Sequence, residues 1–319
     1  MCKADLTCSS SDSGLPLCVW VAVADRFSAL DAQGNWTGLD VDLCRTIAAA
    51  IFDDLTKVRF ILFTAKDRFV ALRSGEVDVL SRNSTVTMSR DTQLGLDSPA
   101  VNYYDGQGFM IRKKLGVSSA KELNGASICT QQGTTNELNL ADYFQANNMT
   151  YQPVAFATGD GTRTTYDGAG CNAFTSDVSG LYAERLRASN PDDHIVLPEI
   201  ISEEPLGPAV RHGDSQWADI VRWTFNAILD AEELGATKVS VEQMKTSANP
   251  EIKRLLGTEG KFGEAIGLSN DWAVRIIKHV GNYGEVFEKN VGEGSRLKIK
   301  RGQNALWTKG GLQYGLPIR

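Results

Sequence analysis

The sequence contains little of what metal sites, membrane spans and nucleic-acid-binding surfaces require. It has 3 histidines, and its 6 cysteines include no CxxC pair, so neither a metal site nor a cofactor is predicted. No apolar run approaches the roughly 20 residues that span a bilayer. The formal net charge is −6, whereas a protein that binds nucleic acid needs a basic surface to contact phosphates. These absences argue against metal catalysis and against a nucleic-acid partner.

The N-terminal residues MCKADLTCSS have no basic segment followed by an apolar one, which is what a secretory signal requires. The chain is therefore expected to be either cytosolic or a mature or truncated form of an exported protein.

The length and the apolar patterns predict two lobes of α/β type. A chain of 319 residues is long for a single hydrophobic core. Apolar runs predict strands over 17–24, 58–63 and 77–80, separated by a helix after residue 38 and a second helix over 66–75 that ends at Gly75. Strands that alternate with helices form a mostly parallel sheet covered by those helices.

The same alternation begins again further along the chain. Strands are predicted over 107–114, 127–131, 151–157 and 171–177, whereas the glycine-rich segment 158–170 is only weakly helical. A strand pair or crossover over 193–214 leads into a long amphipathic helix that ends near Gly235.

Three polar segments follow strands in this pattern, and ligands bind beyond the carboxyl ends of such strands. The first is SRNSTVTMSR, residues 81–90, which holds five hydroxyl side chains and two arginines. The second is the Gly133-Thr134-Thr135 turn, where Thr135 is predicted to cap a helix whose amide groups form an anion site. The third is Asp177 at the end of its strand.

Together these segments match the chemistry of a zwitterionic α-amino acid. The guanidinium of Arg90 and the amides around Thr135 suit an α-carboxylate. The Asp177 carboxylate, the Asn83 carbonyl and the Thr85 hydroxyl suit an ammonium group. Each residue has an ordinary alternative, such as a surface ion pair for Arg90 and a helix cap for Asp177, so only the combination favours binding.

Several stretches resemble the polar amino-acid solute-binding proteins of ABC importers, and most closely their periplasmic general L-amino-acid-binding branch. The stretches are GNWTGLDVDLCRTIA, ALRSGEVDVLSRNSTVTMSRD, QQGTTNELN, SDVSGLYAERL and EPLGPAVRHGD. The resemblance implies a two-lobed type II periplasmic-binding fold with two hinge strands. Residues 1–111 and 205–319 would form lobe one, and residues 112–204 would form lobe two. It further implies a periplasmic location, an ABC transporter permease as partner and a monomer.

Matched position by position, the resemblance implies a set of ligand-binding residues: Phe27, Asn83, Thr85, Arg90, Gly133, Thr134, Thr135 and Asp177. It also implies one disulfide in each lobe, joining Cys18 to Cys44 and Cys129 to Cys171, which suits a periplasmic protein. Four buried free thiols are the alternative.

The chain departs from the branch at four positions that bear on the ligand side chain or on lobe packing. Ala24 is nearest to a position that offers a large apolar residue in the family, and Val86 stands where a tryptophan is expected. Ser98 replaces an aromatic residue, and Asn172 replaces an aspartate. We therefore expect the shared amino-acid groups to be recognised, while the preferred side chain stays open.

Three functions compete. The first is a binding protein that catalyses no reaction and closes over L-amino acids with broad specificity, because most contacts go to groups that all amino acids share. The second is an enzyme on the same fold, such as a cyclohexadienyl-type dehydratase, which needs a poised acid. No nucleophile–base pair supports it. The third is an amino-acid sensor domain, which the sequence does not distinguish from the first.

Overall fold

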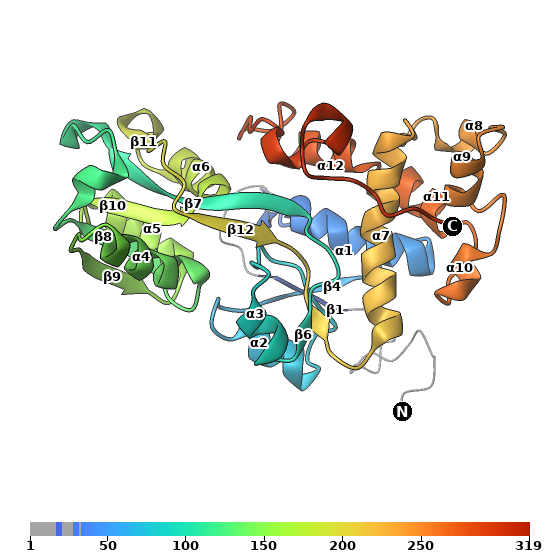
Figure 1. Ribbon diagram of the computed structural model, residues 1–319, viewed down its shortest axis with the longest axis horizontal. Helices are drawn as coiled ribbons and strands as arrows, with labels where there is room; N and C mark the ends of the chain where they lie inside the picture. The colour runs from blue at the N-terminus through green and yellow to red at the C-terminus, as the bar shows by residue number, and fades with distance from the viewer. Residues whose placement is uncertain (1–16, 21–27, 32) are drawn as a thin grey trace.

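The computed structural model describes residues 17–20, 28–31 and 33–319 of the chain. These residues form two α/β lobes that are joined by a pair of long strands (Figure 1). No helix within the described part of the chain is long and apolar enough to cross a bilayer.

The first lobe is built on a parallel sheet with the strand order β4-β1-β5. Its strands are β1 (Leu17–Trp20), β4 (Arg59–Leu62) and β5 (Val79–Leu80). The connecting helices are α1 (Leu39–Phe52) and α2 (Arg68–Ser74), and Gly75 ends α2 in the left-handed conformation that the sequence predicts. Small additions are the β2–β3 hairpin (Ala29–Leu30 with Trp36–Thr37), α3 (Met88–Thr92) and the β6–β13 pair (Leu96–Asp97 with Val210–Arg211).

The second lobe is built on a sheet with the order β11-β7-β10-β8-β9, and β12 pairs with β7. Strands β8 (Ser127–Gln131), β9 (Gln152–Phe156) and β10 (Ala173–Asp177) are parallel, and β11 (His194–Val196) is antiparallel to β7. The helices are α4 (Thr135–Ala146), α5 (Gly159–Asp167) and α6 (Val178–Arg187).

Two antiparallel strands connect the lobes, β7 (Tyr103–Arg112) and β12 (Ser202–Leu206). Their register runs from Gln107 opposite Ser202 to Tyr103 opposite Leu206. Figure 1 shows the two strands side by side between the lobes. The expected boundaries at 111/112 and 204/205 fall within these strands and stay a prediction.

After β12 the chain returns to the first lobe and forms helices that complete its core. The longest is α7 (Ser215–Glu233), which packs with α1 and α11. The others are α8 (Val241–Met244), α9 (Pro250–Leu255), α10 (Phe262–Ala265), α11 (Trp272–His279) and α12 (Tyr283–Asn290). One large hydrophobic cluster joins residues of α1, α7, α11 and α12, and two smaller clusters lie in the second lobe.

The second lobe contains the expected disulfide. Cys129 on β8 is bonded to Cys171, with the two Cα atoms 5.8 Å apart. Cys44 is disulfide-bonded as well. The side chain of Cys18 lies outside those that the structure describes, so the Cys18–Cys44 pairing stays a prediction.

Candidate functional site

A polar pocket lies between the lobes at the carboxyl ends of the strands, where the sequence predicts a site. It is lined by residues of both lobes, among them Asn83, Thr85, Thr134, Thr135 and Asp177. The loop, the helix start and the strand end therefore meet as expected, although Thr85 and Thr135 are 50 residues apart in the chain and Asn83 and Asp177 are 94 residues apart.

The loop after β5 is held in place by the segment that returns from β12. The amide of Val86 donates to the Pro205 carbonyl at 2.8 Å, and the amide of Gly207 donates to the Ser84 carbonyl at 3.0 Å. On its other side the amide of Asn83 donates to the buried carboxylate of Asp40 at 2.6 Å. Burial raises the pKa of Asp40 to about 6 although this hydrogen bond opposes the shift. These contacts fix the loop backbone, so its side chains are presented in a defined way.

Asp177 ends β10 and lies almost fully buried in the pocket. Asp177 occupies the N-cap position of α6, as the alternative interpretation has it, but its side chain makes no capping hydrogen bond to that helix. Instead its two carboxylate oxygens accept from Asn136 of the second lobe at 3.0 Å and from Asn83 of the first lobe at 3.2 Å. Burial, together with the negative charge of Glu204, raises the pKa of Asp177 to about 6.

Glu204, on the connecting strand β12, is a pocket neighbour that sequence reasoning missed. It is 1% exposed. Its carboxylate accepts hydrogen bonds from the hydroxyl of Thr85 in the first lobe and, at 2.9 Å, from the hydroxyl of Thr135 in the second. Asn139 donates to its other oxygen at 2.7 Å. A carboxylate on a connecting strand thus links hydroxyl groups of the two lobes.

Arg90 lies on α3, in contact with the backbone of the loop that carries Thr85. The helix is capped by Thr87, whose hydroxyl accepts from the Arg90 amide at 3.3 Å. The guanidinium donates to the Thr85 carbonyl and lies over the Phe69 ring at 4.8 Å. Burial lowers the pKa of Arg90, while the charges of Glu204 and Asp177 oppose that shift. Its partners are thus a loop carbonyl, a ring and interior acids, rather than a surface ion pair.

The turn before α4 differs in detail from the prediction. Thr134, not Thr135, occupies the capping position, and its hydroxyl donates to the Gln131 carbonyl at 2.8 Å. Thr135 is the first helical residue, which leaves its hydroxyl free to face Thr85 at 3.1 Å. Gly133 has φ +73°, and a Cβ there would lie 3.3 Å from the Lys66 backbone of the first lobe. Gly133 therefore permits close approach of the lobes.

Two predicted positions lie outside the described residues, namely Phe27 and Ala24. Arg68, Arg82 and Asn136 are among the pocket residues that were not predicted. Arg82 stood inside the hydroxyl-rich stretch, so its charge was a signal that could have been used. Arg68 opens α2 and carried no local signal.

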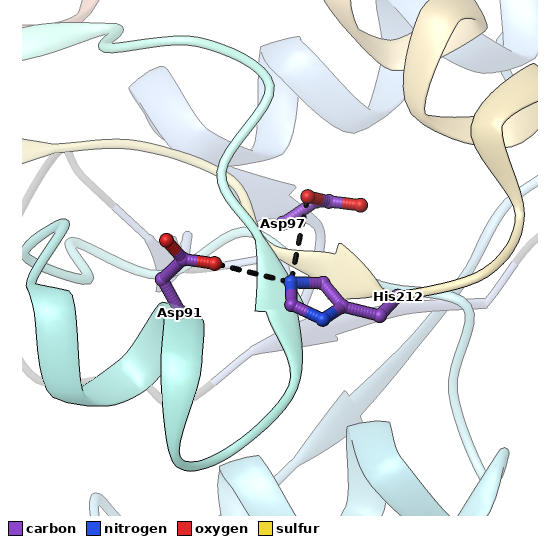
Figure 2. Close-up of side chains that lie close together, drawn as sticks. All are labelled: Asp91, Asp97 and His212. Atoms are coloured by element: carbon purple, nitrogen blue, oxygen red, sulfur yellow. Dashed lines mark hydrogen bonds and ion pairs between the residues drawn. The ribbon is translucent and has the colours of Figure 1, made fainter.

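The described residues contain one set of side chains close enough to share a metal ion, namely Asp91, Asp97 and His212 (Figure 2). Asp91 belongs to α3, Asp97 ends β6, and His212 follows β13. The His212 Nε2 atom lies 3.1 Å from Asp91 Oδ1 and 3.5 Å from Asp97 Oδ1. All three side chains are partly exposed, and a hydrogen bond joins His212 to Asp91. The group ties α3, and with it Arg90, to the β6–β13 pair.

Comparison with known proteins agrees with this geometry. Residues 19–239 match the bacterial extracellular solute-binding proteins, family 3. The chain belongs to this family. It is 59% identical to the general L-amino acid-binding periplasmic protein AapJ of Rhizobium johnstonii over 92% of this chain and 86% of that one. It is 56% identical to the glutamate/glutamine/aspartate/asparagine-binding protein BztA of Rhodobacter capsulatus over 92% and 87%.

A solved structure of a family relative has the same fold. It is an ABC transporter periplasmic binding protein from Brucella ovis with glutathione bound, 58% identical to this chain. The TM-score is 0.94, and the match covers 96% of both chains. The two-lobed periplasmic-binding fold is thereby confirmed.

Proposed function

We propose that this protein captures L-amino acids in the pocket between its lobes and delivers them to the permease of an ABC importer. The observation that carries the proposal is the meeting of Asp177 with the Thr85–Thr135 hydroxyl pair at one pocket, next to Arg90, whose guanidinium donates to the Thr85 carbonyl. A carboxylate suits the ammonium group, and a guanidinium beside hydroxyls and the N-terminus of α4 suits the α-carboxylate.

The relatives support the same chemistry. One is named for general L-amino acids, another for glutamate, glutamine, aspartate and asparagine, and the Brucella structure holds glutathione. The γ-glutamyl end of glutathione also presents a free α-amino and α-carboxylate group. Groups common to all these molecules meet Asp177 and Arg90 in our assignment, so broad specificity is expected.

The remaining expectations follow from this proposal. The protein works in the periplasm as a monomer, without a cofactor and without turnover, and the two lobes close about β7 and β12. The dehydratase alternative needs a protonated acid at the leaving group. Asp177 instead accepts two amide hydrogen bonds, which favour its ionised form, and although burial raises its pKa to about 6 the carboxyl is still mostly ionised at neutral pH. An amino-acid sensor would bind its ligand through the same groups as a transport protein. The two functions are therefore distinguished by whether a partner permease is present.

The first experiment is calorimetric titration of unfolded, washed and refolded protein with the 20 L-amino acids. We expect micromolar or tighter binding of many of them. If none of the 20 amino acids binds, the protein shares the fold of the family but not its amino-acid ligands.

Arg90→Ala is the variant that tests the site. We expect this variant to weaken the binding of every amino acid by a similar amount, roughly 2–5 kcal/mol, because the charge-assisted pair with the α-carboxylate is lost. Arg222→Ala is the control, since Arg222 forms an exposed ion pair with Asp219 within α7. Unchanged affinity in Arg90→Ala would contradict our placement of the α-carboxylate.

A further inference from the structure

Two buried arginines on the pocket wall are not used by the assignment above. Arg68, the first residue of α2, is 2% exposed, and Arg82, in the loop after β5, is 3% exposed. Both line the same pocket as Asp177. A guanidinium carries five N–H donors and cannot lose its charge in a protein, so full burial requires acceptors.

The acceptors that the described residues offer are few. Arg68 donates from Nη1 to the Arg82 carbonyl at 3.3 Å and lies over the Phe69 ring at 4.6 Å. The Nε atoms of both arginines are buried and have no hydrogen-bond partner among the described residues. Unsatisfied buried donors in a pocket indicate a ligand or water that completes them.

The neighbouring acids are already engaged. Both oxygens of Asp40 accept hydrogen bonds, from the Asn83 amide at 2.6 Å and from Asn102 at 3.0 Å. Both oxygens of Asp177 accept from the side-chain amides of Asn83 and Asn136. These carboxylates balance the arginine charges, but the hydrogen bonds that their oxygens accept come from amide groups and not from Arg68 or Arg82.

Repulsion among the guanidinium groups of Arg68, Arg82 and Arg90 increases the need for an anion at this side of the pocket. Arg68 and Arg90 both lie over the Phe69 ring, at 4.6 and 4.8 Å from its centre. Burial lowers the pKa of Arg82 to about 10, with the charges of Asp177 and Asp40 opposing the shift and that of Arg90 adding to it. One α-carboxylate at Arg90 leaves Arg68 and Arg82 with only Asp40 and Asp177 as counter-charges, and no side chain among the described residues accepts a hydrogen bond from either Nε.

We infer that Arg68 and Arg82 form a second anion subsite, which receives a second carboxylate carried by an α-amino acid ligand. This inference rests on the proposed function, because it assumes that Arg90 and Asp177 hold the α-carboxylate and the ammonium group. The second carboxylate has two possible sources, the side chain of a dicarboxylic amino acid or the terminal carboxylate of a short γ-glutamyl peptide.

The test compares ligands that differ in that carboxylate. L-Glutamate, L-glutamine and glutathione are titrated calorimetrically into refolded wild type, Arg82→Met and Arg68→Met. We expect the variants to lose glutamate affinity by roughly 10- to 100-fold, the value of one or two charge-assisted hydrogen bonds, while glutamine changes by less than about 3-fold. If the variants lose affinity for both glutamate and glutathione, the subsite also accepts the terminal carboxylate of the peptide. If they lose affinity for glutathione alone, the subsite binds the peptide carboxylate and not the glutamate side chain.

Controls separate binding from folding. Arg112→Met removes another buried arginine whose Nε also lacks a partner, but Arg112 lies in the second lobe, where it donates to the carbonyls of Tyr166 and Cys171. This control should leave the glutamate-to-glutamine ratio unchanged. Arg82→Lys keeps the charge and serves where the Met variants do not fold, and it should retain part of the preference.

The outcomes are distinguishable. Equal losses of glutamate and glutamine in folded variants, or no loss of either, would overturn the second subsite and leave the amino-acid site standing. If wild-type protein binds none of the α-amino acids, the proposed function fails first, and this inference fails with it.

Discussion

At the scale of the residue, Asp177 holds two amide hydrogen bonds inside the pocket. One of the two donors, Asn83, belongs to the other lobe, so the carboxylate participates in a contact between lobes before any ammonium reaches it. A ligand ammonium would add to this contact or replace it, and in either case it would meet an ionised acceptor at neutral pH.

Asp177→Asn tests that assignment. The variant keeps the size of the side chain and removes its charge, so we expect amino acids to lose roughly 10-fold or more in affinity. Deaminated analogues with the same carboxylate should lose much less, because they bring no ammonium group. Titration of each pair of ligands into both proteins measures the difference, and equal losses would remove Asp177 from the ammonium role.

At the scale of the element, the segment after β12 positions the binding loop. Leu80 and Ala209 exchange backbone hydrogen bonds at 2.8 and 2.9 Å, and Thr85 pairs with Leu206. The loop that carries Asn83 and Thr85 is therefore held by the same strand that carries Glu204. A movement of β12 during closure of the lobes would therefore also move the loop that carries Asn83 and Thr85.

Gly207→Ala tests the role of that segment. An added Cβ would lie 2.0 Å from the Ala100 carbonyl oxygen, which is backbone and has little room to move. We expect a loss of about 1–3 kcal/mol in the free energy of unfolding, as for other overpacked sites. Amino-acid affinity should fall as well, because the Gly207 amide holds the Ser84 carbonyl. Urea unfolding and calorimetry measure the two effects. Wild-type stability and affinity in this variant would show that the segment can shift to accommodate the added Cβ without cost.

At the scale of the whole molecule, the ligand-free protein carries several acids whose charge is destabilising when buried. Burial raises the pKa of Asp40 and Asp177 to about 6 and that of Asp105 to about 7, from an ordinary value of 3.8. The folded state therefore binds more protons than the unfolded state between about pH 4 and pH 7, so stability falls as pH rises through that range.

We accordingly expect the melting temperature of ligand-free protein to be lower at pH 8 than at pH 5.5. Each raised group contributes on the order of 1 kcal/mol or more to the change. Asp177→Asn should reduce this dependence, because its side chain has no proton to gain. Scanning calorimetry of refolded wild type and variant measures it. A melting temperature that rises from pH 5.5 to pH 8 in both proteins would show that these carboxyl groups titrate normally.

The sequence by itself determined the repeated strand–helix order and the residue types at the strand ends. Strand β8 and the helix α1 follow the predicted pattern because local periodicity decides which face is buried. Asn83 and Thr85 follow β5 of one sheet and Asp177 ends β10 of the other, so each lies at the carboxyl end of a parallel strand, and the two lobes bring these ends to one pocket. Segment 158–170 was underestimated, since α5 is capped by the Thr158 hydroxyl and packed in the second lobe. Such tertiary support outweighs poor helix propensity.

Only the tertiary structure decided which charges share the pocket. Glu204 lies 119 residues from Thr85 in the chain and meets it because β12 returns beside the binding loop. Arg68 gives no local signal of its pocket position, because the first residue of a helix is ordinarily solvated. Its burial depends on how α2, the loop after β5 and the second lobe come together. Contacts of this kind arise from the packing of distant segments, and neither periodicity nor a short motif records them.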